Sequence, residues 1–434
     1  MRARLGLILL TSACLLGASG CKTQSDEGGG DKAGGDKGAA QGAKKAGSDA
    51  LIGVDMDKKV VSIGALNDES GPGAAIGKPF ANGKRLLVKR INAGGSGLLP
   101  DGWTIELVER DHAYNPQQSV QQYNAIKGKV LFIATSFGTP NTLPLRKQLE
   151  RDGLLAFPAS LSSKMAEHPN TPPIAPSYVN EARRAMDWAV QHAGGADKIK
   201  AGIVYQKDDY GKDGLDGWKQ AAAMYGVEVV AEQTVEPGQK DVTAVVSALN
   251  SAGANYVLLT TLPSSTGPVL GTSAQLQYGP VWIGSTPAWI DRFFSPEVIP
   301  AAVFSNFYWV SGVPFWGEKL PGMDEFVAAW ETHGKDMGEQ DSYVLTSYIA
   351  GLIQVEALRR AIDSGDLSRA GYMAAMRSIK GWNAGGMIEP IDLTKLPYEP
   401  GLRTRILKPM MAEKTWQVVA DYAEPQNAPG GAQN

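Results

Sequence analysis

Residues 60–111 show the pattern of a strand, a loop, a long helix and a second strand, and this segment constrains the fold most strongly. Residues 60–65 form a short apolar run with β-branched side chains, which is typical of a strand buried on both faces. Apolar residues then recur at helical spacing over residues 74–91, and a second strand pattern starts at Thr104. This βαβ unit predicts a parallel sheet with its functional edge at the carboxyl ends of the strands.

The alternation of strand and helix patterns continues along the chain and predicts an α/β protein of two consecutive doubly wound halves. Further strands are predicted at residues 130–134, 154–157, 201–205, 227–230, 256–260 and 280–283. The chain crosses into the second half near residues 176–178, and the best helix pattern covers residues 342–363. With 434 residues, of which 43% are hydrophobic, the chain is long enough to bury two cores.

The first 21 residues have the pattern of an export signal. Arg2 and Arg4 precede an apolar stretch at residues 5–16, which is short for a membrane span. The small residues that follow resemble a bacterial lipobox ending at Cys21. We therefore expect a lipoprotein signal peptide that leaves a lipid on Cys21 and anchors the protein to a membrane. Cleavage as an ordinary signal peptide is the alternative.

Two segments have the composition of disordered chain. Residues 22–57 are rich in Gly, Ala, Lys, Asp and Ser, and residues 425–434 are polar. Such segments cannot bury enough apolar surface to offset the entropy lost on ordering. We expect a flexible tether at residues 22–57, which lets an anchored domain move off the membrane, and a disordered tail at the C-terminus.

Patterns of catalytic, metal and nucleotide sites are weak in this sequence. Residues 71–77 approach a dinucleotide-binding glycine pattern, but residues 67–71 separate them from the strand, whereas the fingerprint needs a tight turn at the strand end. The carboxylates at residues 207–213 lack the spacing of a calcium loop. The four histidines are scattered, and no GxSxG motif is present. A net charge of -3 argues against nucleic acid. We therefore predict no enzymatic activity, cofactor, metal or nucleic-acid partner.

The order of motifs in the first βαβ unit also resembles a known family. The sequence reads IGAL from Ile63, SGP from Ser70, INAGG from Ile91 and a final RD ending at Asp111. It is similar to the opening of the leucine/isoleucine/valine-type periplasmic binding proteins, the type I solute-binding proteins of ABC importers, and the similarity extends to about Tyr422. The resemblance implies two Rossmann-like lobes joined by a multi-strand hinge, with a ligand held between them on closure.

The resemblance further implies a domain division and a set of partners. Lobe 1 is expected at residues 58–180 and 306–384, and lobe 2 at residues 181–305 and 385–424. We expect a monomer at the periplasmic face of the cell envelope that captures a small molecule and delivers it to the permease of an ABC importer. A ligand-sensing domain that signals to a membrane partner is the alternative, followed by an exported enzyme.

Most candidate ligand-binding residues come from loops at the carboxyl ends of predicted strands, and Ile76 falls where the resemblance implies a side chain, often aromatic, that covers the ligand. Loops with glycine or hydroxyl side chains offer free N–H groups to a carboxylate, and Tyr210 resembles a second-lobe tyrosine of the family that packs on the ligand. The candidates are Ile76, Ser136, Gly138, Thr139, Ala159, Ser160, Tyr210, Leu262 and Thr286. Trp289 and Trp309 are further candidates for the wall of the cleft.

The residue at position 286 bears on the chemistry of the ligand. In amino-acid-binding members of the family an acid in this loop pairs with the ammonium group of the ligand, whereas this sequence has Thr286. A buried ammonium needs a counter-charge, so an α-amino acid fits only if Asp291 or another acid substitutes. The expected ligand is a small carboxylate-bearing molecule, either a branched-chain or other amino acid or an organic or aromatic acid.

Overall fold

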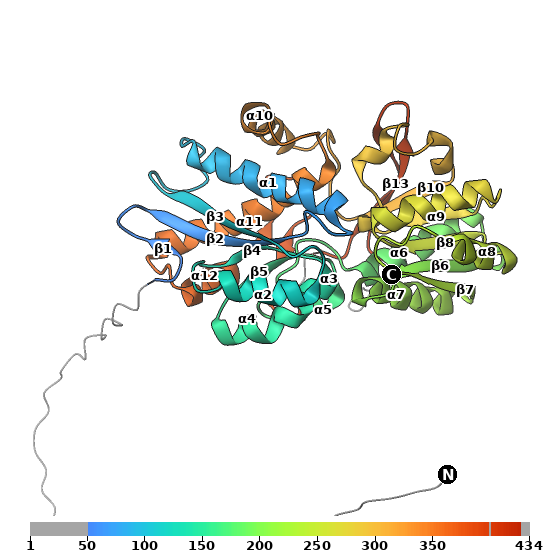
Figure 1. The fold of residues 1–434 in the computed structure, drawn as a ribbon, viewed down its shortest axis with the longest axis horizontal. Coiled ribbons are helices and arrows are strands. Elements are labelled where there is room, and N and C mark those ends of the chain that lie inside the picture. The colour runs from blue at the N-terminus through green and yellow to red at the C-terminus, as the bar shows by residue number, and fades with distance from the viewer. Residues whose placement is uncertain (1–50, 399–400, 427–434) are drawn as a thin grey trace, which may run out of the picture. The chain divides into compact units, whose positions relative to one another are not determined.

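The computed structural model describes residues 51–398 and 401–426, which belong to one compact unit (Figure 1). Its strands form two large sheets and one two-stranded sheet. The predicted signal peptide, Cys21, and most of the predicted tether and tail lie outside the described residues. Within the described residues, no helix combines the length and the apolar composition that a membrane span needs.

The first sheet consists of four parallel strands and one short antiparallel strand. They are β1 (Val54–Asp55), β2 (Val60–Asn67), β3 (Thr104–Asp111), β4 (Ile133–Phe137) and β5 (Ala156–Ala159). Strand β2 pairs with β3 along its whole length and with β4 on its other side. Strand β1 pairs with β2, so residues 51–57 are folded, and the prediction of a disordered tether is wrong for them.

Helices cover both faces of the first sheet. One face carries α1 (Ala74–Asn92), α10 (Met323–His333), α11 (Ser342–Ser364) and α12 (Arg369–Met376), and the other carries α2 (Pro116–Ile126), α3 (Thr139–Thr142) and α4 (Arg146–Asp152). The short helix α5 (Ser163–Ala166) follows β5. Leu86, Leu87 and Ile91 of α1 are buried in the core that α11 completes. We call the first sheet and these helices the first lobe.

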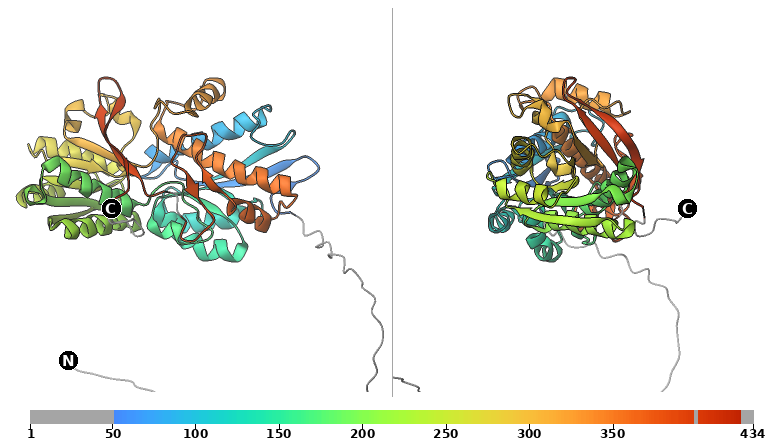
Figure 2. Two further views of the ribbon diagram at one scale, coloured as in Figure 1. Left: turned by 180° about the vertical axis from the view of Figure 1, so that it is seen from behind. Right: turned by 90° about the vertical axis from the view of Figure 1, so that its right-hand side faces the viewer.

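The second sheet continues the same architecture. Its strands are β6 (Lys200–Gln206), β7 (Glu228–Val235), β8 (Tyr256–Thr260), β9 (Val281–Gly284), β10 (Phe307–Ser311), β13 (Thr404–Met410) and β14 (Thr415–Ala423). Strands β6 to β10 are parallel, and the β13–β14 hairpin adds antiparallel strands at the edge beside β10 (Figure 2). Helices α6 (Tyr178–Ala193) and α7 (Asp209–Tyr225) cover one face, and α8 (Thr243–Ser251) and α9 (Pro263–Gln275) the other. We call this the second lobe. The predicted doubly wound α/β fold is thus confirmed.

Two segments lie in a different lobe from the one that the sequence suggested. Strand β10 pairs with β9 and β13 in the second sheet, so the chain returns to the first lobe only after Ser311. Strands β11 (Lys380–Trp382) and β12 (Ile391–Asp392) form the small sheet, and Ile391 and Leu393 are buried in the core of the first lobe. Residues 385–398 therefore pack with the first lobe.

Hydrogen bonds join the two lobes around their interface. The Tyr343 hydroxyl, from the first turn of α11, donates to the Thr286 carbonyl at 2.7 Å. The Ser264 hydroxyl donates to the Pro72 carbonyl at 2.9 Å, and Gln206 Nε2 donates to the Tyr114 hydroxyl at 3.1 Å. These contacts join the lobes, and the candidate site lies among them.

Candidate functional site

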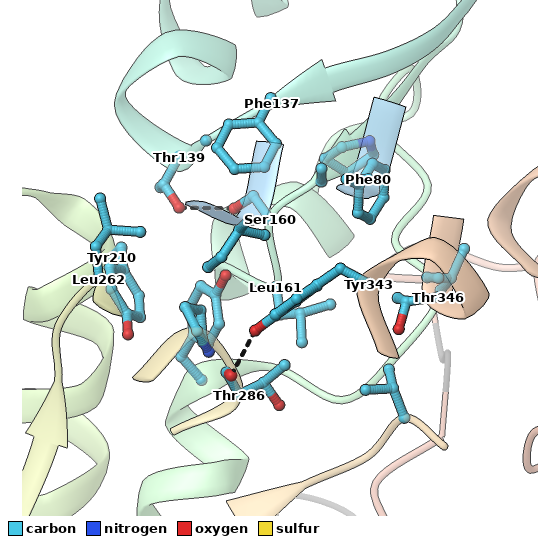
Figure 3. Close-up of a pocket in the computed structure, with 18 of the residues that line it drawn as sticks. Phe80, Phe137, Thr139, Ser160, Leu161, Tyr210, Leu262, Thr286, Tyr343 and Thr346 are labelled. Carbon is cyan, nitrogen blue, oxygen red and sulfur yellow. Dashed lines mark hydrogen bonds between the residues drawn. The ribbon is translucent and has the colours of Figure 1, made fainter. Parts of the chain in front are cut away.

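A cavity lies between the two lobes, at the carboxyl ends of β4 and β5 (Figure 3). It contains about 650 Å³ of empty space, including the part that opens to solvent. First-lobe residues such as Phe80 and Thr139 form one part of its wall, and second-lobe residues such as Leu262 and Thr286 form another.

The structure brings most of the sequence-predicted site residues together. Eight of the nine line this cavity, namely Ile76, Gly138, Thr139, Ala159, Ser160, Tyr210, Leu262 and Thr286. Ser136 does not. It lies within β4, which runs to Phe137, whereas the sequence placed the strand end at residue 134. Successive side chains of a strand point to opposite faces, so Phe137 lines the cavity and Ser136 does not. The Ser136 hydroxyl is buried and lies 2.7 Å from Thr142 Oγ1. Contact of the other eight residues with a ligand stays a prediction.

Other residues of the wall were missed by the sequence analysis. They include Phe80, Tyr114, Phe137, Leu161, Tyr178 and Tyr343. Phe80 follows Ile76 by four positions on α1, so the helical period could have identified it. Tyr343 comes from a helix that starts more than 200 residues later in the chain, and no local sequence pattern predicts its arrival.

Hydroxyl groups concentrate in one part of the wall. Thr139 Oγ1 and Ser160 Oγ lie 2.6 Å apart, and Ser160 Oγ also accepts from the Ser162 amide at 3.3 Å. In a hydroxyl pair one group donates to the other, so the second keeps its hydrogen for an acceptor in the cavity. This pair is therefore a donor site suited to a carboxylate oxygen.

Gly138 is needed at the end of β4 for steric reasons. Its φ of 87° lies in the region that side chains rarely adopt. A Cβ atom there would lie 2.7 Å from Asn141 Nδ2 and 2.8 Å from Tyr114 Cε2. Only glycine lets the chain turn here and present Thr139 to the cavity.

The hydroxyl groups of two wall tyrosines are already engaged. The Tyr210 hydroxyl lies 2.7 Å from Ser285 Oγ, and the Tyr343 hydroxyl donates to Thr286 O. Burial raises the pKa of both phenols well above the ordinary value, so both are neutral. Because their hydroxyls serve the protein, these residues offer mainly their aromatic rings to a ligand.

The wall of the cavity carries no charged side chain. Its 19 residues include no Asp, Glu, Lys, Arg or His. Asp291, the acid considered as a substitute partner for an ammonium group, lies outside the wall and accepts hydrogen bonds from the Ser342 amide at 2.7 Å and the Ser342 hydroxyl at 2.6 Å. Glu181 is a carboxylate behind the wall, where it accepts from the Thr286 amide at 2.9 Å. The cavity thus lacks a direct counter-charge for an ammonium group.

Trp289 and Trp309 do not line the cavity. Both are buried, with exposures of 0% and 1%, in the aromatic core of the second lobe. Trp309 Nε1 donates to the Thr286 carbonyl at 3.0 Å and so supports the loop that forms the wall. Their contribution to the site is structural.

In the two loops whose sequences resembled nucleotide and metal sites, the polar groups form hydrogen bonds within the protein. The amides of Gly71 and Gly73 donate to the Asp68 carboxylate at 2.7 and 2.8 Å, so the protein itself occupies the N–H groups that a phosphate would need. In the loop before α7, Asp208 caps the helix by accepting from the Gly211 amide at 3.0 Å. The described residues contain no group of three or more His, Cys, Asp or Glu that could hold a metal ion.

Comparisons with known proteins identify the family of this chain and several relatives. The family model described as periplasmic binding protein matches residues 60–395. A Leu/Ile/Val-binding protein homolog from Brucella melitensis is 27% identical over 45% of this chain and 53% of its own length. The chain spans about half the length of the first curated relatives that it matches.

Solved structures show the same architecture. A fatty acid ABC transporter substrate-binding protein from Thermomonospora curvata has a TM-score of 0.78 and 25% identity, over 87% of this chain and 95% of its own. A branched chain amino acid ABC transporter protein from Thermus thermophilus, with bound valine, has a TM-score of 0.75 and 19% identity, over 85% and 97% of the two chains. The family model thus confirms the family predicted from the sequence, and the solved structures confirm the fold.

Proposed function

This chain belongs to the periplasmic binding protein family, and from that premise we propose that it is an extracytoplasmic receptor for a small carboxylate-bearing solute. The solute binds in the cavity between the lobes and favours the closed arrangement, because only that arrangement contacts it from both sides. The receptor then delivers it to the permease of an ABC importer. A lipid on Cys21 anchors the receptor to the membrane at the periplasmic face, and no chemical step takes place in the cavity.

The observation that carries this proposal is the composition of the cavity wall. Apolar and aromatic side chains dominate it, among them Phe80, Phe137, Leu161 and Leu262. The Thr139–Ser160 hydroxyl pair provides one hydrogen-bond donor within the wall. This combination fits a ligand with an apolar body and one polar head, because each polar group of the ligand must find a partner when it is buried.

Among carboxylates, the wall favours those without an ammonium group. A buried ammonium ion without a counter-charge costs several kcal/mol, and neither Thr286 nor Asp291 supplies one. Glu181 lies behind the wall, and burial raises its pKa to about 8, so this acid is mostly neutral at pH 7. We therefore propose an aliphatic or aromatic monocarboxylate and not an α-amino acid. The described relatives support both classes, since one is named for a fatty acid and another has bound valine.

A thermal-shift screen of the purified protein tests the ligand class. The library contains hexanoate, octanoate, phenylacetate, leucine and valine, together with the neutral amides of the three acids. Ligand at about a hundred times its dissociation constant adds about 2.7 kcal/mol of stability, which is visible as a raised melting temperature. We expect octanoate or phenylacetate to raise it and the amino acids to have no effect. A shift with leucine alone would refute the proposed class.

Two matched variants test the proposed carboxylate contact. Thr139→Val removes one hydroxyl of the Thr139–Ser160 pair. We expect the affinity for a carboxylate ligand to fall roughly 10- to 100-fold, since hydrogen bonds to charged groups contribute about 1.5–3 kcal/mol. Thr346→Val makes the same change at another part of the wall, where the hydroxyl donates to the Ser342 carbonyl at 2.9 Å. Calorimetric titration should show nearly unchanged affinity for this control. Equal losses in both variants would contradict the assignment.

A further inference from the structure

Glu181 is a buried carboxylate directly behind the cavity wall. It lies in the first turn of α6 and is fully buried, with an exposure of 0%. Its Oε2 atom accepts from the Thr286 amide at 2.9 Å, and its Oε1 atom lies 2.5 Å from Thr286 Oγ1. Thr286 itself lines the cavity. A single residue therefore separates this carboxylate from the space in which a ligand would bind.

No positive charge accompanies Glu181 in the described residues. The titratable groups that face it are three phenols, those of Tyr178 on its own helix, Tyr210 on α7 and Tyr343 on α11. Arg184, one turn further along α6, points elsewhere and donates to the Asp421 carbonyl at 3.4 Å. Burial without a cation raises the pKa of Glu181 to about 8.

The contact with Thr286 accommodates either protonation state of Glu181. As a carboxylate, Glu181 accepts from both the amide and the hydroxyl of Thr286. As a neutral acid, it still accepts from the amide, and its own hydroxyl donates to Thr286 Oγ1. Ionisation therefore changes the charge behind the wall while the hydrogen-bonded pair stays in place.

That charge would act on the head group of a bound solute. In a buried, poorly solvated site, two negative charges repel strongly, and a carboxylate ligand is disfavoured when the neighbouring acid is ionised. A positively charged head group would experience the opposite effect. A neutral head group would be nearly unaffected.

We propose that Glu181 is a specificity-determining positioning residue that holds Thr286 in the wall and stays protonated while the cavity holds a carboxylate. This rests on the function proposed above, in which the solute binds in this cavity. Carboxylate binding and ionisation of Glu181 then oppose each other. The receptor takes up a proton with its ligand wherever Glu181 is ionised in the free protein, and its affinity falls as the pH rises.

The test measures dissociation constants for octanoate, octanamide and octylamine by calorimetry between about pH 6 and about pH 9.5, where the octanoate charge is constant. For the wild-type protein we expect the affinity for octanoate to fall on the order of tenfold across this range. The affinity for octanamide should stay constant, and any affinity for octylamine should rise up to the pH at which the amine itself deprotonates.

Glu181→Gln is the decisive variant. The glutamine amide keeps an acceptor for the Thr286 amide and a donor for Thr286 Oγ1, but it cannot ionise. We expect this variant to bind octanoate with an affinity that no longer depends on pH. Glu228→Gln, at an exposed position on β7, is the control and should retain the wild-type profile. A purely structural role for Glu181 would lower the affinity in the variant without flattening the profile, and that result would overturn the proposal.

A measurement without ligand separates this proposal from the proposed function. Between about pH 5 and about pH 8 the folded protein keeps a proton on Glu181 that the unfolded chain has lost, so the wild type loses stability with rising pH and Glu181→Gln does not. The melting temperature of the variant relative to wild type should increase by about 5 °C or more over this range. If the difference in melting temperature between Glu181→Gln and wild type does not change with pH, the proposal is overturned. If this difference rises with pH but neither octanoate nor phenylacetate binds, Glu181 is protonated as proposed and the ligand class is refuted instead.

Discussion

Replacement of Lys84 by methionine is expected to stabilise the protein. Lys84 lies in the middle of α1, between this helix and α11, and its side chain is 2% exposed. Its Nζ atom donates to Gln354 Oε1 at 2.9 Å, and among the described residues no carboxylate offsets the burial of the ammonium group. Burial lowers the pKa of the ammonium group from 10.5 to about 7. A charged lysine at this position is therefore costly.

The magnitude follows from this change in pKa. Each pKa unit corresponds to about 1.4 kcal/mol, so the difference between 10.5 and 7 represents about 5 kcal/mol of destabilisation at neutral pH. Methionine keeps most of the side-chain volume and removes the charge. It also leaves Gln354 Oε1 without its donor, at a cost of about 1–3 kcal/mol. The net gain in the free energy of unfolding is then about 2–4 kcal/mol at or below pH 7.

The pH dependence distinguishes this mechanism from a simple packing effect. Between about pH 7 and pH 10.5 the unfolded chain binds a proton at Lys84 that the folded chain does not, so wild-type stability rises with pH in this window. The advantage of Lys84→Met should therefore be largest at pH 7 and below and should decrease as the pH approaches 10.5.

Urea denaturation of both proteins at several pH values provides the measurement. Lys78→Met, on the same helix but at an exposed position, is the matched control and should change the free energy of unfolding by no more than about 0.5 kcal/mol. Destabilisation by Lys84→Met at every pH would refute the reasoning, because it would show that the buried ammonium is stabilised by its surroundings.

Two further predictions concern the contacts that α1 and α9 make with residues 68–73, the loop after β2. Gly77→Ala should lower the free energy of unfolding by about 1–3 kcal/mol in urea denaturation, because a Cβ atom there would lie 1.7 Å from the Asp68 carbonyl oxygen. Gly128→Ala is the control, and it should leave the free energy of unfolding nearly unchanged because open space surrounds Gly128. Ser264→Ala removes the hydrogen bond to Pro72 between the lobes, and we expect octanoate affinity to fall about two- to tenfold in calorimetric titration. Ser264→Ala should bind the different ligands in the same order of affinity as wild type. A changed order would contradict the view that Ser264 acts only by joining the lobes.

Local sequence patterns predicted much of the fold because the buried strands and long helices are regular. The βαβ pattern at residues 60–111 corresponds to β2, α1 and β3, and the helix pattern at residues 342–363 corresponds to α11. The ends of elements were less predictable. Strand β4 begins three residues later than its apolar run, since residues 130–132 are buried before the strand starts. This shift moved Ser136 from the predicted loop into the strand.

The lobe to which the later segments belong was harder to predict. Strand β10 and residues 385–398 have apolar patterns that suit either core. Their partners are chosen by long-range pairing, β10 with β9 and β13, and Ile391 with the core around α11. Helix α10 was missed, although Phe326 and Trp330 follow a helical spacing on its buried face.

The sequence by itself determined the family, the doubly wound α/β fold and most of the first-lobe loop residues at the site. These follow from local periodicity and from motif order, which a linear chain carries directly. The tertiary structure alone decided that Tyr343 meets Thr286 across the lobes, that Asp291 accepts from the Ser342 amide at the start of α11 and that Glu181 lies behind the cavity wall. Each of these contacts joins segments more than 50 residues apart. Such contacts depend on how two lobes pack, and the charge and shape of the cavity depend on them.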